Sequence, residues 1–172
     1  FPLVDARDKL WVGAASLGFA YDSFEGVLAK SDVVTLHVPY MKETHHLMDE
    51  KAFSAMKPGA YLINTSRGAV VDTDAMVRAL KKGTLGGAGL DVLEEEGIVK
   101  DEMKFLVDGH PNAESLKVAL ENHVLIDLPN VVVTPHNAFN TREGKERILS
   151  TTIENISSFV AGKPINVVVQ HG

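Results

Sequence analysis

Hydrophobic residues occur along the chain in two alternating patterns, as short continuous runs and as longer stretches with helical spacing. The continuous runs predict strands at residues 32–39, 60–66, 86–93 and 130–135. The stretches with helical spacing predict helices at residues 49–59 and 72–83, and a long helix that begins near Thr141 and stops at Gly162. Strands therefore alternate with helices over most of the chain.

The order and length of these elements indicate the fold class. The predicted strands show no regular polar alternation, as expected when helices cover both faces of a sheet. The connections between the first three strands are long enough for right-handed helical crossovers. We therefore expect an α/β fold with a doubly wound parallel sheet. Residues 97–128 interrupt the alternation with mixed charges, a Gly-His-Pro turn and one helical patch. Their apolar residues are too few for an independent core, so we expect a surface excursion there and not a second domain.

Composition narrows the class of function. The 172 residues suit one domain, and a net charge of −6 argues against nucleic-acid binding, which needs a concentrated basic face. The absence of cysteine excludes disulfides, thiolate metal sites and Cys nucleophiles, and it fits a reducing, cytoplasmic location. No apolar run reaches the roughly 20 residues that span a bilayer, so no membrane partner is expected. His45 and His46 are weak evidence for a metal without a third ligand, so no metal site is predicted.

Polar side chains follow each predicted strand at its carboxyl end. In open parallel sheets ligands bind outside that edge, so these residues are the first candidates for chemistry. The four strand ends carry His37-Val38-Pro39, Asn64 to Gly68, Asp91 followed by Glu94-Glu95-Glu96, and Pro135-His136-Asn137. An arginine fork suits a substrate carboxylate, and an imidazole oriented by a carboxylate is a usable proton donor. Together these groups predict a site for a small anionic molecule.

Each of these groups also has a purely structural interpretation. Standing alone, Arg67 is as easily a surface residue in a salt bridge, and His136 an incidental histidine beyond a strand. A run of three glutamates is usually a solvated acidic loop, and the sequence does not say which of them faces inward. Asp91 is harder to dismiss, because an unpaired carboxylate in or just after a buried strand is costly.

From about residue 20 to residue 165 the chain closely resembles the D-isomer-specific 2-hydroxyacid dehydrogenases. The motifs that carry the resemblance are SDVVTLHVP, INTSRGAVVDTDA, GAGLDVLEEE and LPNVVVTPHNAF, in this order and with sensible spacing. The resemblance implies a Rossmann-like NAD-binding domain and an enzyme that transfers a hydride between NAD and a 2-hydroxy or 2-keto acid. It also implies a homodimer when the protein is intact.

The resemblance gives roles to residues in these motifs. Arg67 of NTSRG would bind the substrate carboxylate and polarise the keto oxygen, and His136 would be the acid–base residue. Glu96, five residues after Asp91, would be the partner of that histidine. Asp91 would contact the nicotinamide carboxamide, and Asp22 of AYDSF would bind the adenosine ribose hydroxyls. Further residues that would line the cofactor site are His37, Val38, Pro39, Thr44 and Thr65.

Two details resemble the D-lactate dehydrogenase branch of the family, namely the long excursion before Pro129 and the sequence HNAF after the fourth strand. Asn140 stands where that branch often has an aromatic residue, which leaves the preferred substrate open. A second hypothesis is an NAD-sensing corepressor, a binding module of the same fold that can retain the Arg, Glu and His. Peptide binding without 2-keto acid reduction would distinguish this module from the enzyme.

The chain departs from the family pattern at its N-terminal edge. A G-x-G-x-x-G turn should precede the ribose-binding Asp by about 20 residues. The only glycines in residues 1–21 are Gly13 and Gly18, and they do not form this motif. We therefore expect a sheet that is incomplete at this edge, and we interpret residues 1–172 as a partial NAD-binding domain of a longer polypeptide. Residues 141–172 would form a C-terminal helix and tail that lead toward a missing substrate-binding lobe. This chain alone is expected to bind NAD weakly or not at all and to be inactive.

Overall fold

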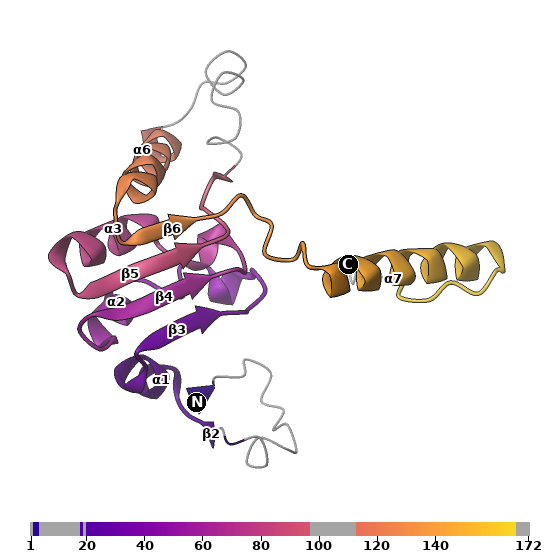
Figure 1. The fold of residues 1–172 in the computed structure, drawn as a ribbon, viewed down its shortest axis with the longest axis horizontal. Coiled ribbons are helices and arrows are strands. Elements are labelled where there is room, and N and C mark those ends of the chain that lie inside the picture. Colours follow the sequence, from indigo (N-terminus) through magenta and orange to yellow (C-terminus); the bar gives the residue numbers. More distant parts are fainter. Residues whose placement is uncertain (1, 4–17, 19, 97–112, 168–172) are drawn as a thin grey trace. The chain divides into compact units, whose positions relative to one another are not determined.

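The computed structural model describes residues 2–3, 18, 20–96 and 113–167, and the chain divides into two compact units, residues 1–135 and 136–172 (Figure 1). The first unit contains a parallel sheet with helices, and the second contains one long helix. Parts of the sequence-based predictions lie outside the described residues, namely Gly13, residues 97–112 of the expected excursion and the tail from residue 168.

The first unit is built on a four-stranded parallel sheet in the order β3–β4–β5–β6. Its strands are β3 (Val33–Leu36), β4 (Ala60–Asn64), β5 (Leu85–Leu90) and β6 (Val131–Val133). One register row across the sheet consists of the buried residues Val34, Leu62, Ala88 and Val131. The predicted α/β fold with a parallel sheet is thus confirmed.

The strands are shorter than the hydrophobic runs that predicted them. β3 ends at Leu36 and β5 at Leu90, so His37 and Asp91 lie just beyond the hydrogen-bonded ladder. A hydrophobic run marks buried chain, whereas a strand ends where its neighbour stops pairing. The polar groups are therefore found at the carboxyl edge of the sheet and not inside it.

Burial alternates along β3 and the start of β4, whereas consecutive residues of β5 are buried. Val34 and Leu62 are buried, whereas Val33 and Tyr61 are 56% and 51% exposed. Across from Tyr61, β5 contributes a glycine, and a Cβ at Gly87 would lie 2.8 Å from the Tyr61 ring. Gly87 itself is buried, so this side of the sheet is partly covered at β5, and exposed positions are on β3 and β4 among the residues that the structure describes.

Among the described residues, four helices contribute to the core, namely α1 (Phe24–Lys30), α2 (Glu50–Ala55), α3 (Thr73–Lys82) and α6 (Ala113–Asp127). The helix predicted at residues 72–83 is confirmed with both of its caps. The Asp72 carboxylate accepts a hydrogen bond from the Ala75 N–H, and Gly83 ends the helix with a φ of 73°. Met76 and Leu80 of α3 pack into the same core as the strands, and this burial is the main source of helix stability.

The helix α6 lies within the segment that the sequence predicts to be a surface excursion. Its Leu125 is fully buried in the main core, and Val118 and Asn122 are also buried. The helix packs against α3 and β6. The described half of the segment therefore adds a helix to the core of the first unit.

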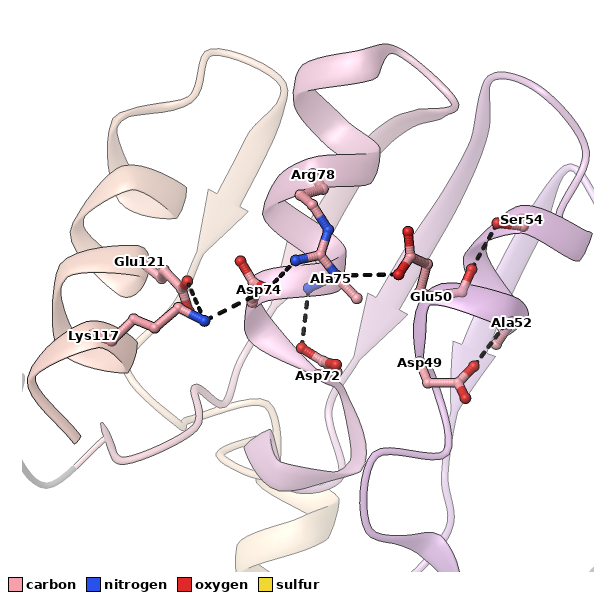
Figure 2. A network of polar contacts seen from close by, with 10 residues as sticks. All are labelled: Asp49, Glu50, Ala52, Ser54, Asp72, Asp74, Ala75, Arg78, Lys117 and Glu121. Atoms are coloured by element: carbon pink, nitrogen blue, oxygen red, sulfur yellow. Dashed lines mark hydrogen bonds and ion pairs between the residues drawn. The ribbon is translucent and has the colours of Figure 1, made fainter. Parts of the chain in front are cut away.

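A polar network connects α2, α3 and α6 (Figure 2). Arg78 on α3 forms an ion pair with Asp74 one turn earlier and lies 3.5 Å from the Glu50 carboxylate of α2. Lys117 on α6 lies 3.6 Å from both Asp74 and Glu121. Ion pairs of this exposure contribute about 0–1 kcal/mol each, so apolar packing and not this network holds the three helices together.

The remaining elements lie on either side of this sheet in the sequence. β1 (Pro2–Leu3) and β2 (Ala20–Tyr21) pair in parallel as a separate two-stranded sheet, and β2 leads to α1 (Phe24–Lys30). Two short 3₁₀ turns are η2 (Lys42–Thr44) and η3 (Gly68–Val70). The second unit contains α7 (Arg142–Val160), which begins directly after Thr141, as predicted. The Thr141 hydroxyl is its N-cap and accepts a hydrogen bond from the Gly144 N–H. Among the described residues, no helix is both long and apolar enough to cross a membrane.

Candidate cofactor and substrate site

The carboxyl ends of β3, β4 and β5 meet at one edge of the sheet. Leu36, Asn64 and Leu90 form the last register row of these strands, so the chain leaves the sheet at the same level in all three. The predicted site residues that follow this row are His37, Thr65, Arg67 and Asp91. The structure therefore brings these groups together at the edge where open parallel sheets bind ligands.

Asn64 organises the loop that carries Arg67. Its buried side-chain oxygen accepts hydrogen bonds from the Ser66 N–H at 3.0 Å and from the Ser66 hydroxyl at 2.9 Å. Its amide nitrogen donates to the Arg67 carbonyl at 3.0 Å. The Arg67 side chain is exposed, and its guanidinium donates to the Ser66 carbonyl at 2.7 Å. The loop is thus fixed from within, while its charged end is accessible to an incoming carboxylate.

Gly68 brings this loop against the segment that follows β5. It is the first residue of η3 and comes directly after Arg67. A Cβ at Gly68 would collide with the backbone of Leu93 and Glu94, so only a residue without a side chain permits this approach. The loop that carries Arg67 therefore packs directly on the backbone that leads to Glu96.

Asp91 lies just beyond β5 and is 4% exposed. Its carboxylate accepts a hydrogen bond from the Thr134 hydroxyl at 2.5 Å, and its backbone N–H donates to the Asn64 carbonyl at 2.9 Å. A buried carboxylate without donors is costly, so the Thr134 hydroxyl helps to explain how the fold accommodates Asp91. Thr134 was not predicted as a site residue from the sequence. The signal that could have indicated it is a hydroxyl residue at the end of a run of valines.

The three consecutive glutamates have different surroundings. Glu94 forms hydrogen bonds with His46 and Thr73, both at 2.8 Å, and its side chain is 14% exposed. Glu95 is exposed and has a positive φ of 51°. Glu96 is half-buried. The interpretation of this run as a solvated acidic loop therefore does not hold for Glu94.

The predicted cofactor-site residues after β3 lie in one loop, and they differ in whether they stabilise that loop or are accessible to a ligand. His37 Nε2 lies 2.9 Å from the Thr35 hydroxyl. Thr44 is buried, and its hydroxyl donates to the Pro39 carbonyl at 2.8 Å while it accepts a backbone N–H at 2.8 Å. Pro39 is exposed and Val38 is half-buried. Thr44 therefore holds the loop in shape, whereas His37, Val38 and Pro39 present surface that a ligand can contact.

Asp22 lies at the N-terminus of α1, directly after β2. One carboxylate oxygen accepts a hydrogen bond from the Ser23 N–H at 2.8 Å, and the other pairs with Lys30 at 2.6 Å. The hydrogen bond from Lys30, together with that from Ser23, holds the pKa of Asp22 below its ordinary value. A ribose hydroxyl would have to compete with these donors for the carboxylate. The ribose-binding role of Asp22 stays a prediction.

His136 is the first residue of the second unit. It is half-buried and has a positive φ of 54°, which is uncommon for a residue other than glycine. Backbone hydrogen bonds from Asn140 to Asn137 and from Thr141 to Phe139 form the turns that connect it to α7. His136 belongs to the second unit and Glu96 to the first, so their pairing stays a prediction.

Comparison with known families decides what kind of domain this is. A family model described as "D-isomer specific 2-hydroxyacid dehydrogenase, NAD binding domain" matches residues 4–138. The chain belongs to this family. The Rossmann-like fold and NAD as the cofactor of this dehydrogenase domain are thereby confirmed.

Curated relatives of this dehydrogenase domain have several names. A glyoxylate reductase of Thermococcus litoralis is 42% identical over 153 residues, which are 88% of this chain and 40% of the relative. A glycerate dehydrogenase of Methylorubrum extorquens is 40% identical over 144 residues, which are 84% of this chain and 40% of the relative. The chain thus spans about two fifths of the length of these relatives.

Solved structures similar to this dehydrogenase domain include complexes with NAD. The D-lactate dehydrogenase of Aquifex aeolicus, complexed with NAD and lactic acid, gives a TM-score of 0.76 at 41% identity and covers 94% of this chain and 46% of that one. The NAD complexed form of a D-isomer specific 2-hydroxyacid dehydrogenase from Lactobacillus delbrueckii ssp. bulgaricus gives a TM-score of 0.77 at 30% identity and covers 98% and 48%.

The carboxyl edge of the sheet suits the nicotinamide end of the cofactor. The buried Asp91 carboxylate is an acceptor that matches the N–H donors of a carboxamide. Val38 and Pro39 provide apolar surface at the same edge for a flat ring. Within the described residues, no group of three His, Asp or Glu side chains could hold a metal ion.

Proposed function

We propose that this NAD-binding domain works within a longer polypeptide that transfers a hydride between NADH and a small 2-keto acid. The observation that carries the proposal is the strand edge at which the exposed Arg67, on a loop fixed by Asn64, lies with the buried Asp91. NADH would supply the hydride when it is bound. An arginine fork and a carboxylate acceptor at one edge suit an anionic keto substrate beside the nicotinamide.

Four side chains have separate roles in substrate binding, proton transfer and cofactor orientation. Arg67 binds the substrate carboxylate with its planar fork and stabilises negative charge on the keto oxygen. His136 donates the proton that this oxygen gains on reduction, and Glu96 orients the imidazole. Asp91 orients the nicotinamide by accepting a hydrogen bond from its carboxamide. Because the Thr134 hydroxyl already fixes the Asp91 carboxylate, little reorganisation is needed.

Pyruvate and D-lactate are the proposed substrate pair, and a homodimer is the proposed assembly of the intact protein. The long segment before β6 and the sequence HNAF support this substrate. The similarity to the Aquifex aeolicus D-lactate dehydrogenase at 41% identity supports it as well. The glyoxylate reductase and glycerate dehydrogenase among the relatives make glyoxylate and glycerate the competing substrates.

Initial rates of NADH oxidation with pyruvate and with glyoxylate test this proposal in the full-length polypeptide. His136→Ala should lower kcat by roughly 10²- to 10⁴-fold, because it removes the proton donor. Arg67→Lys should raise the KM for the keto acid strongly, because lysine cannot form the bidentate pair. Arg78→Lys on α3 can keep its ion pair with Asp74 and is the matched control. A wild-type protein that reduces no 2-keto acid would contradict the proposal.

A further inference from the structure

Glu94 is a junction between the segment after β5 and three other elements. Its carboxylate forms hydrogen bonds with His46, in the loop before α2, and with Thr73, in the first turn of α3, both at 2.8 Å. Its backbone carbonyl accepts a hydrogen bond from the Asn122 amide of α6 at 2.7 Å. We call these four residues, Glu94, His46, Thr73 and Asn122, the Glu94 cluster.

Three of the four residues of the Glu94 cluster are well shielded from water. Thr73 and Asn122 are 3% and 0% exposed, and the side chain of Glu94 is 14% exposed, whereas that of His46 is 35% exposed. The His46 ring stacks on His45 with ring centroids 3.9 Å apart, which restrains its orientation. Hydrogen bonds to a charged group are stronger in such surroundings than at an exposed surface. The cluster is therefore a defined anchor and not a loose surface contact.

His46 connects the Glu94 cluster to the loop of Arg67. Its backbone N–H donates to the Ala69 carbonyl at 2.9 Å, in the turn η3 that follows Arg67 directly. Gly68, at the start of the same turn, packs against the backbone of Glu94. A closed set of contacts thus runs from the arginine loop through His46 to Glu94 and returns through Gly68.

We propose that Glu94 is a positioning residue that sets the separation between the side chains of Arg67 and Glu96. The proposal rests on the proposed function, in which both side chains serve one substrate. Glu96 lies two residues beyond Glu94, and Arg67 directly precedes η3. A displacement of the Glu94 cluster therefore moves the two loops relative to each other. In this role Glu94 contacts neither the substrate nor NAD.

Steady-state kinetics of the full-length polypeptide test this role. Glu94→Ala removes both side-chain bonds and should lower kcat by on the order of 10- to 100-fold, the effect of a catalytic group displaced by about 1 Å, with little change in the KM for NADH. Glu94→Gln can keep both bonds and should recover most of the lost kcat. Glu95→Ala changes the exposed neighbour of Glu94, is the matched control, and should keep kcat within about twofold of the wild type.

Hydrogen exchange on the same preparations reports on the Glu94 cluster without requiring activity. The amides of residues 93–96 and 69–71 should exchange at least about tenfold faster in Glu94→Ala and at the wild-type rate in Glu95→Ala. If the wild type reduces no 2-keto acid, the proposed function fails. The exchange rates then still decide whether Glu94 holds the two segments together.

The positioning role is overturned if Glu94→Ala keeps kcat within about twofold of the wild type, or if exchange in both segments is unchanged. An equal loss of kcat in Glu95→Ala would also overturn it, because the effect would then follow charge and not position. If Glu94→Ala does not fold, Thr73→Val removes only the 2.8 Å bond to Glu94 and decides the question by the same criteria.

Discussion

At the scale of single residues, the surroundings of Asp22 stabilise the ionised form of its carboxyl group. Lys30 donates to one carboxylate oxygen and the Ser23 N–H to the other, and both lower the pKa of Asp22 below 3.8. A carboxyl group whose pKa is lowered by folding stabilises the fold at pH values above its unfolded pKa. That contribution is lost as the pH falls through the lowered pKa of the folded state. Because Asp22 is exposed to solvent, the contribution is small.

The change Lys30→Met should raise the pKa of Asp22 toward 3.8, because it removes the largest cause of the lowering. The carboxyl ¹³C chemical shift of Asp22, followed by NMR through the acidic range, measures this pKa directly. Lys57→Met removes an equal charge beside Asp32 and serves as the control, which should leave the titration of Asp22 unchanged. An identical Asp22 titration in Lys30→Met and wild type would contradict the assigned cause.

Site residues that follow a single apolar run could be predicted from the sequence, and those that depend on contacts across the fold could not. Arg67 and Asp91 come directly after such runs, so their place at the strand edge could be inferred. The hydroxyl partner of Asp91 is Thr134, 43 residues away in the sequence. Glu94 likewise binds His46 across 48 residues. No spacing rule connects such pairs, so the residues by themselves could not distinguish the three glutamates, and only the family resemblance singled out Glu96.

At the scale of elements, the caps of α3 give a direct test of its stability. Asp72→Ala should lower the free energy of unfolding by roughly 0.5–2 kcal/mol, because the Ala75 N–H loses its acceptor. Urea unfolding of the chain measures this as a lower midpoint. Asp32→Ala, which removes an exposed ion pair with Lys57, is the control and should change the free energy by less than about 0.5 kcal/mol. Equal midpoints for the two variants would indicate that no cap was lost.

The ends of α3 were predicted more accurately than the ends of the strands, because capping signals are local whereas strand pairing is not. Asp72 and Gly83 delimit α3 as the sequence indicates. The apolar runs extend past the ends of β3 and β5, and after β5 the chain is still buried through Val92 although pairing has stopped. Val33 is as apolar as Val34 yet exposed, because the cover of a sheet face comes from other elements. The mixed charges of residues 97–128 indicated a surface excursion with a helical patch, and they did not indicate that Leu125 of α6 reaches the core.

At the scale of the whole molecule, the proposed chemistry depends on residues from both compact units. We predict that the 172-residue chain alone binds NADH weakly or not at all and shows no NADH oxidation with pyruvate. Residues 1–21 lack the G-x-G-x-x-G pattern that binds the pyrophosphate. A fluorescence titration with NADH and an absorbance assay with pyruvate measure both properties, with the full-length polypeptide as the control. Pyruvate-dependent oxidation by the purified chain would show this prediction to be wrong.

The order of the strands in the sheet repeats their order along the chain, from β3 to β6. During synthesis each strand therefore meets a neighbour that has already left the ribosome, and the sheet can grow in one direction as the chain emerges. The last addition is separated from the others by the long connection between Leu90 and Val131, and such distant pairing is slow. Asp91 gains the Thr134 hydroxyl only at that step. We therefore expect the hydrogen bond between Thr134 and Asp91 to form after the other three strands have paired.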